Sequence, residues 1–252
     1  MRPFFSALGY EVIRRPQDPP PAPPDPPPAP LDPLVSLLNS HRVGTVVDVG
    51  ANVGQFGLKL RKAGFDGLII SIEPLSSAFG RLQSTASANG PWEVIRSAAG
   101  DRNGEIEINI AGNSDSSSVL PMAKCHEDAA PTSRYVGTET VPACTLDTLL
   151  GGRINEMGRF LLKLDVQGYE DRVLAGAAET LSSATGLLME TSTVPLYEGS
   201  LCIQEVLPAI TKQGFTLQHV ERAFWDDKTL RLLQLDCLFF RDTALQSIGA
   251  DC

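Results

Sequence analysis

Short apolar runs alternate with amphipathic segments along most of this chain. Five runs predict buried strands, at residues 46–49, 68–72, 92–99, 160–164 and 187–189. Continuous runs of this length are typical of strands buried on both faces of a parallel sheet. Apolar residues spaced three and four apart fill the intervals and predict helices, for example Phe56, Leu60 and Ala63, which end at Gly64. The alternation predicts an α/β fold of Rossmann-like type with a mostly parallel, seven-stranded sheet.

Three segments depart from this alternation. Residues 105–110 alternate polar and apolar with period two, and residues 139–145 contain Pro142, so we expect a small β insertion in which the second segment is an edge strand. The polar tract between them, 111–118 and onward to about 137, is typical either of a loop that covers a ligand or of a solvated connector, and we expect His126 to be exposed on it. Residues 215–224 and 230–240 predict a terminal antiparallel hairpin.

The first strand leads into a turn rich in glycine. Asp48 precedes Gly50, and Gly50 and Gly54 lack a Cβ atom, so the backbone there can approach a ligand closely. The second strand ends at Glu73, about 20 residues later, where such folds place the acid that binds a ribose. The segment therefore predicts a nucleotide-type site.

The spacing of the glycines favours one nucleotide over another. A dinucleotide-binding turn follows G-x-G-x-x-G, but Asn52 and Gln55 stand where its second and third glycines belong. An acid and an asparagine suit the ammonium and carboxylate of S-adenosylmethionine, and Glu73 suits its ribose. We therefore predict a methyltransferase in which Ala98 and Ala99, past the third strand, line the adenine pocket. An NAD(P)-dependent oxidoreductase is the alternative.

Three side chains are candidates for the catalytic chemistry. Asp165 and Glu190 follow two predicted strands, and ligands of open α/β sheets bind at such carboxyl ends. A hydroxyl acceptor has a pKa of ~16, so a carboxylate must take its proton during methyl transfer, or a metal must lower that pKa first. Asp165 is the first candidate for a base, and Asp165 with Glu190 would also suit Mg²⁺. Asp165 has the alternative of pairing with Lys163 or capping the next helix, and His219 is a rival base or a plain strand histidine.

Composition sets the domain limits. Residues 16–33 hold most of the 19 prolines and predict an extended linker between a short helical segment at 1–15 and a domain at 34–245. No segment of the sequence has the length and hydropathy of a membrane span. A binding or scaffold module without catalytic activity is a further alternative, for which the proline segment is the only indication.

The net charge indicates the kind of substrate, and the cysteine content indicates the cellular compartment. The formal net charge is −9, and such a surface repels nucleic acid, which favours a small-molecule acceptor. Five scattered cysteines without a C-x-x-C pair indicate neither a zinc site nor a disulfide framework, so we expect a cytoplasmic protein.

Residues 45–241 resemble the FkbM family of S-adenosylmethionine-dependent O-methyltransferases. The resemblance rests on the segments VVDVGANVGQFGL, SIEP, TLDTLL and LLKLDVQGYEDRVLAGA. It implies a class I methyltransferase fold and methyl transfer to a hydroxyl of a small metabolite, such as the sugar of a glycolipid or glycoside, or a macrolide-like polyketide. It also implies cofactor contacts at Asp48, Gly50, Asn52, Gly54 and Glu73. This chain has Gln167 where the family usually shows glutamate.

Overall fold

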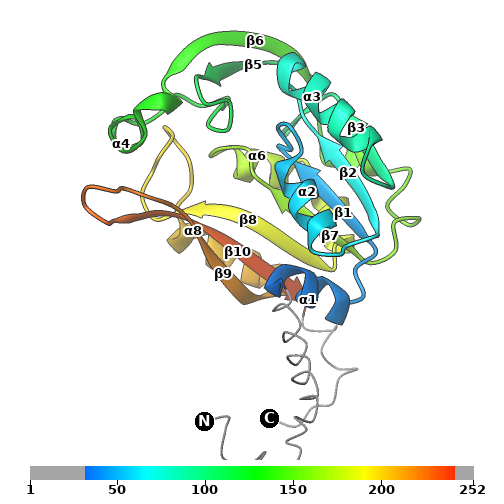
Figure 1. Ribbon diagram of the computed structural model, residues 1–252. Helices are drawn as coiled ribbons and strands as arrows, with labels where there is room; N and C mark the ends of the chain where they lie inside the picture. Colours follow the sequence, from blue (N-terminus) through cyan, green and yellow to red (C-terminus); the bar gives the residue numbers. More distant parts are fainter. Residues whose placement is uncertain (1–31, 242–252) are drawn as a thin grey trace, which may run out of the picture. The chain divides into compact units, whose positions relative to one another are not determined.

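A seven-stranded sheet forms the centre of the computed structural model, which describes residues 32–241 (Figure 1). The strand order is β3-β2-β1-β7-β8-β10-β9, and every neighbouring pair is parallel except those of β10, which runs antiparallel to β8 and β9. The strands are β1 (Thr45–Val49), β2 (Leu68–Ile72), β3 (Trp92–Ile95), β7 (Phe160–Leu164), β8 (Gly186–Ser192), β9 (Phe215–Trp225) and β10 (Leu232–Arg241). The parallel sheet and its terminal hairpin confirm the predicted fold class. The segment predicted at 1–15 and most of the linker predicted at 16–33 lie outside the described residues.

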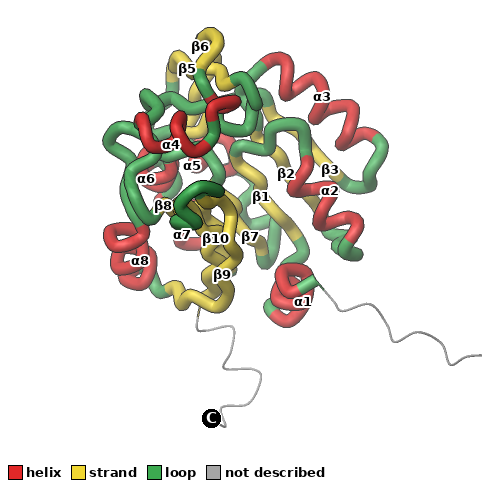
Figure 2. Tube along the Cα trace, turned by 60° about the vertical axis from the view of Figure 1, so that its left-hand side comes forward, coloured by secondary structure: helices red, strands yellow, loops and turns green. Residues whose placement is uncertain are grey.

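Helices cover both faces of this sheet (Figure 2). One face packs against α1 (Pro33–Ser40), α2 (Gln55–Lys62) and α3 (Ser76–Ser87), and the other against α5 (Leu146–Leu150), α6 (Glu170–Ala175), α7 (Ala178–Ser183) and α8 (Ile203–Lys212). Strand residues alternate between the two cores: Val46 belongs to the first, and Val47 and Val49 to the second. The three layers explain why the central strands are mainly apolar.

Glycines explain where two of the helices end. Gly64, after α2, has φ of +94°, as its place at the predicted stop requires. The apolar residues at 173–181 belong to two helices, α6 and α7, because the chain breaks at Gly176. A Cβ atom there would lie 2.1 Å from the carbonyl oxygen of Gly100, so close packing fixes the break.

A second sheet contains β4 (Ala98–Ala99), β6 (Tyr135–Cys144) and β5 (Gly104–Ala111), in the order β4-β6-β5. The strand expected over 92–99 is therefore divided: its first half pairs with β2 and its last two residues pair with β6. The prediction that 139–145 is an edge strand is wrong, since β6 lies between the other two. Pro142 is tolerated because β4 pairs only with Ala143 and Cys144.

The segment between β5 and β6 is more ordered than the polar tract suggests. It contains α4 (Lys124–Ala129) and a 3₁₀ turn at Pro131–Ser133. His126 is buried, not exposed as expected, and its ring packs edge-on against Tyr197 at 5.2 Å between centroids. No helix within residues 32–241 is long and apolar enough to cross a membrane. Cys125, Cys144, Cys202 and Cys237 are free thiols, and the cytoplasmic location stays a prediction.

Candidate functional site

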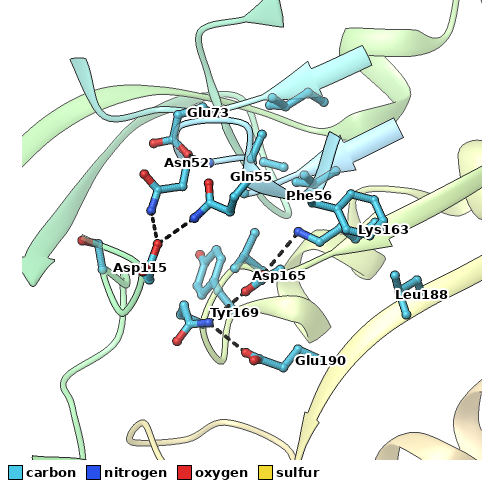
Figure 3. Close-up of a pocket in the computed structure, with 18 of the residues that line it drawn as sticks. Asn52, Gln55, Phe56, Glu73, Asp115, Lys163, Asp165, Tyr169, Leu188 and Glu190 are labelled. Atoms are coloured by element: carbon cyan, nitrogen blue, oxygen red, sulfur yellow. Dashed lines mark hydrogen bonds and ion pairs between the residues drawn. The ribbon is translucent and has the colours of Figure 1, made fainter. Parts of the chain in front are cut away.

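A cavity of about 500 Å³ opens where β1, β2, β7 and β8 end (Figure 3). Most of the residues singled out in the sequence line it: Gly50, Asn52, Glu73, Ala98, Ala99, Asp165, Glu190 and His219. Asp48 and Gly54 are not among the lining residues. The carboxyl ends of parallel strands meet at one edge of a sheet, which explains how segments more than 100 residues apart contribute to one site.

The glycines of the turn serve close packing within the protein. Gly50 has φ of +78°, and a Cβ atom on it would lie 1.9 Å from the backbone oxygen of Asp165. Gly54 has φ of +91° and faces Leu82, Thr85 and Trp92, on the side away from the cavity. The turn thus brings the backbone after β1 against the backbone after β7.

Asp48 forms a buried ion pair with Lys163. Its carboxylate is fully buried and lies 3.0 Å from Nζ of Lys163, which is also 3.3 Å from Oδ2 of Asp165. Burial lowers the pKa of Lys163, but Asp165 and Asp48 together raise it above its ordinary value. Lys163 is therefore charged, and the pairing foreseen as an alternative for Asp165 is present. The side chain of Asp165 still exposes 35% of its surface and faces the cavity.

Glu73 is held by the backbone on both of its oxygens. Oε2 accepts a hydrogen bond of 2.9 Å from the amide of Asn52, and Oε1 accepts one of 2.9 Å from the amide of Leu75. The residue is 5% exposed, and burial raises its pKa to about 7. Each oxygen keeps a second lone pair, so this carboxylate can still accept hydrogen bonds from a ligand.

The side-chain amide of Gln167 bridges Asp165 and Glu190, which the sequence pattern did not predict. Nε2 of Gln167 donates to Oδ1 of Asp165 and to Oε2 of Glu190, both at 2.8 Å. Gln234 donates to the same oxygen of Glu190, also at 2.8 Å. Burial, and next the charge of Asp165, raise the pKa of Glu190 well above its ordinary value.

The arrangement does not support Mg²⁺ at Asp165 and Glu190. The space between the two carboxylates holds the amide group of Gln167, which donates protons and cannot ligate a cation through its nitrogen. Among residues 32–241, no three or more His, Cys, Asp or Glu side chains are grouped to hold a metal ion.

His219 lies at the far end of the cavity. It is on β9, which β8 and β10 separate from β7, so it stands about 14 Å from the strand that carries Asp165. Its Nε2 is 3.5 Å from Oε1 of Glu221. The structure thus brings Asp165 and Glu190 together and leaves His219 apart from them.

The loop between β5 and α4 supplies a side chain that sequence reasoning missed. Asp115 accepts hydrogen bonds from Nδ2 of Asn52 and, at 2.9 Å, from Nε2 of Gln55, both of which belong to the glycine turn and the start of α2 (Figure 3). Ser114 also bonds Asn52, at 2.9 Å. The polar run at 111–118 was the signal for a ligand-covering loop, but it did not identify Asp115.

A family model shows the family to which the chain belongs. The family model described as the methyltransferase FkbM domain matches residues 48–217 of this chain. The 2-O-methyltransferase NoeI of Sinorhizobium fredii (strain NBRC 101917 / NGR234) is 26% identical over 171 residues, which are 64% of this chain and 69% of that protein.

Two solved structures are also similar to the chain. Methyltransferase FkbM from Methylobacillus flagellatus KT is 18% identical with a TM-score of 0.48, over 78% of this chain and 43% of that chain. Magnesium protoporphyrin IX methyltransferase (ChlM) from Synechocystis PCC 6803 with bound SAM is 14% identical with a TM-score of 0.45, over 83% of this chain and 76% of that chain. The chain thus spans less than half the length of the first of these two.

Proposed function

The chain belongs to the FkbM family of S-adenosylmethionine-dependent methyltransferases, and we propose that the group it methylates is a hydroxyl of a small glycoside or polyketide-type metabolite. The observation that carries the proposal is Asp165, a partly exposed carboxylate at the end of β7 whose side chain faces the cavity. A hydroxyl acceptor needs a group that takes its proton, and a carboxylate in that place provides one.

The residues around the glycine turn fit the cofactor. Glu73 offers two carboxylate oxygens to the ribose hydroxyls, and Ala98 and Ala99 leave room beside Tyr169 for the adenine. Asp48 departs from the pattern expected for the family, because Lys163 already neutralises it. The cofactor supplies an electrophilic methyl group, so orientation of the acceptor oxygen accounts for much of the catalysis.

Asp165 both orients the acceptor and receives its proton. Lys163 pairs with Oδ2 of Asp165, and the remaining lone pairs of this carboxyl group can accept a hydrogen bond from the hydroxyl. An alkyl hydroxyl is too weak an acid to ionise first, so its proton passes to Asp165 as the oxygen attacks.

The far part of the cavity suits a polyol with an apolar face. Phe56, Leu188 and Leu238 give it an apolar wall, while Glu221 and Asp236 add hydrogen-bond acceptors. Such a mixture is typical of small-molecule sites in which a few polar groups fix the orientation. The name of NoeI as a 2-O-methyltransferase is consistent with a sugar hydroxyl as acceptor.

Calorimetric titration with S-adenosylhomocysteine, beside NADH, tests the cofactor. We expect binding of the former alone, at least tenfold weaker in Glu73→Ala, whereas binding of NADH alone would overturn the proposal. The catalytic step is tested with Asp165→Asn in a screen of glycoside and polyketide acceptors. This variant should keep its affinity for S-adenosylhomocysteine and lose at least a hundredfold in kcat, and full turnover would exclude Asp165 as the base.

A further inference from the structure

Glu190 is an acidic side chain without a cation beside it. Lys163 is bonded to Asp48 and Asp165, and within residues 32–241 no Lys, Arg or His forms an ion pair with Glu190. The carboxylate instead receives two amide donors on the same oxygen, from Gln167 and Gln234. Asp236 is its partner residue on β10, so the surroundings of Glu190 are acidic on both sides.

Gln167 is therefore the group that lets Asp165 and Glu190 approach one another. Its Nε2 carries two hydrogens, and one points to each carboxylate at 2.8 Å. Two neighbouring carboxylates repel when both are ionised, unless a proton, a cation or a shared donor reduces the repulsion. Burial and the charge of Asp165 raise the pKa of Glu190, which favours its protonated form, and Gln167 adds a donor that both acids share. Here the shared donor is a neutral amide.

The orientation of this amide is fixed. Oε1 of Gln167 lies 2.6 Å from the hydroxyl of Tyr197, a residue with no exposed surface. A flipped amide would turn its carbonyl oxygen toward two carboxylate oxygens and lose both hydrogen bonds. Tyr197 and the two acids thus select the same orientation.

The backbone of Gln167 is held in a rare conformation that directs the side chain to this place. Its φ is +55°, in the left-handed region that side-chain-bearing residues seldom adopt. Its carbonyl oxygen accepts a hydrogen bond of 2.7 Å from Ser118, and Oε1 of Glu170 accepts from the amides of Val166 and Gly168 on either side. Strain that surrounding contacts maintain in this way is typical of functional sites.

We propose that Gln167 is a positioning residue whose amide takes the place of a divalent cation between Asp165 and Glu190, and that methyl transfer consequently needs no divalent metal. The inference rests on the proposed function, in which Asp165 contacts the acceptor. It deepens that function by assigning the charge balance of the site to one neutral side chain. The amide nitrogen donates where a metal would accept, so the two arrangements exclude one another.

The test is Gln167→Glu, which keeps the shape of the side chain and replaces the donor by a third carboxylate. We expect this variant to bind Mn²⁺ or Mg²⁺ at least tenfold tighter than the natural protein, measured by calorimetry without any substrate. We also expect its kcat to fall at least tenfold in the presence of a chelator and to recover in part with Mg²⁺. The natural protein should keep full activity in the chelator.

Gln234→Glu is the matched control. It also adds a carboxylate beside Glu190, but Gln234 does not contact Asp165, so no cation position between the two acids is created. The proposal is overturned if chelation abolishes the activity of the natural protein, or if both glutamate variants bind metal equally. The metal titration is independent of turnover, so it stays informative even if Asp165→Asn proves fully active and the proposed base is wrong.

A second variant covers the case in which Gln167→Glu does not fold. Gln167→Leu removes both donors without adding charge, and we expect it to lose at least tenfold in kcat with unchanged affinity for S-adenosylhomocysteine. Tyr197→Phe removes only the hydroxyl that orients the amide and should lower kcat by a few-fold with the same KM. Unchanged kcat in both variants would show that the amide has no positioning role.

Discussion

At the scale of single residues, buried charge organises the floor of the site. Asp48 and Lys163 face each other across β1 and β7, and a hydrogen-bonded chain continues from Asp48 through Ser71 to the indole of Trp92. A buried ion pair contributes little net stability, but removal of one partner leaves the other charge uncompensated. Asp48 therefore balances the buried charge of Lys163, which also pairs with Asp165.

Glu73 makes the stability of the protein depend on pH. Burial raises its pKa from 4.5 to about 7, so between these values the folded state keeps a proton that the unfolded chain has released. The stabilisation is complete below pH 4.5 and is lost as the pH rises to 7, by on the order of 3 kcal/mol. Glu73→Gln removes this dependence. Between pH 5 and 8 the free energy of unfolding of the natural protein should therefore fall relative to that of the variant.

Urea unfolding of both proteins across this range measures the difference. Glu105→Gln, at an exposed position on β5, is the control and should parallel the natural protein. A Glu73→Gln curve that also runs parallel to it would contradict the assignment, because other raised acids such as Glu170 and Asp236 contribute equally to both curves.

Sequence alone located the strand ends better than it oriented the side chains. Asp165 and Glu73 directly follow β7 and β2, as the apolar runs predicted. Glu190 was predicted to follow its strand, but it lies inside β8, which continues to Ser192 because its polar end still pairs with β10. The pattern did not predict the partner of Asp48. Lys163 lies 115 positions away, and only the register of β1 on β7 sets the two residues opposite each other. The bridge at Gln167 was equally hidden, since it requires β8 beside β7.

At the scale of elements, one carboxylate joins two helices. Asp147 on α5 accepts hydrogen bonds from the amide and hydroxyl of Thr180, both at 2.8 Å, and from the amide of Glu179 at 3.0 Å. The N-cap of α7, Ala177, offers no capping side chain of its own. Desolvation raises the pKa of Asp147, but the hydrogen bonds from Thr180 and Glu179 together lower it by more. The net pKa is below the ordinary value, so the cap is ionised at neutral pH.

Asp147→Ala should therefore destabilise the fold without touching the site. Loss of a helix cap and its buried amide partners costs about 1–2 kcal/mol. The measurement is thermal or urea unfolding beside titration with S-adenosylhomocysteine, whose affinity should not change because Asp147 is not among the lining residues. Asp66→Ala, at an exposed loop position, should leave both unchanged. Weaker cofactor binding in Asp147→Ala would mean that α5 positions the cavity.

The elements that sequence missed are those whose limits depend on a distant partner. β1, β2, β7 and β8 are continuous apolar runs and were predicted. The division of 92–99 into β3 and β4 was not, because both halves are apolar and only the second sheet decides which strand each one joins. The break at Gly176 likewise depends on a contact with Gly100, which no local pattern shows.

At the scale of the whole molecule, the two sheets meet at the side of the cavity that is lined by Glu73, Ala98 and Ala99. β4 continues the chain from β3, and the loop after β5 returns to the glycine turn of the main sheet. Asp115 is the residue of this loop that bonds both Asn52 and Gln55, and it is itself exposed. The second sheet thus supports a loop that lines the cavity and is bonded to the glycine turn through the side chain of Asp115.

Asp115→Ala should open that loop. Each of the two hydrogen bonds contributes about 1 kcal/mol, so their loss should speed the release of S-adenosylhomocysteine by about thirtyfold in a stopped-flow displacement experiment. The melting temperature should stay within a degree or two, since an exposed side chain carries little of the fold. Asp128→Ala, on α4 and outside the lining residues, should change neither quantity. If release is unchanged in Asp115→Ala, the loop closes through other contacts, such as that of Ser118 with the backbone of Gln167, and the attachment at Asn52 and Gln55 is incidental.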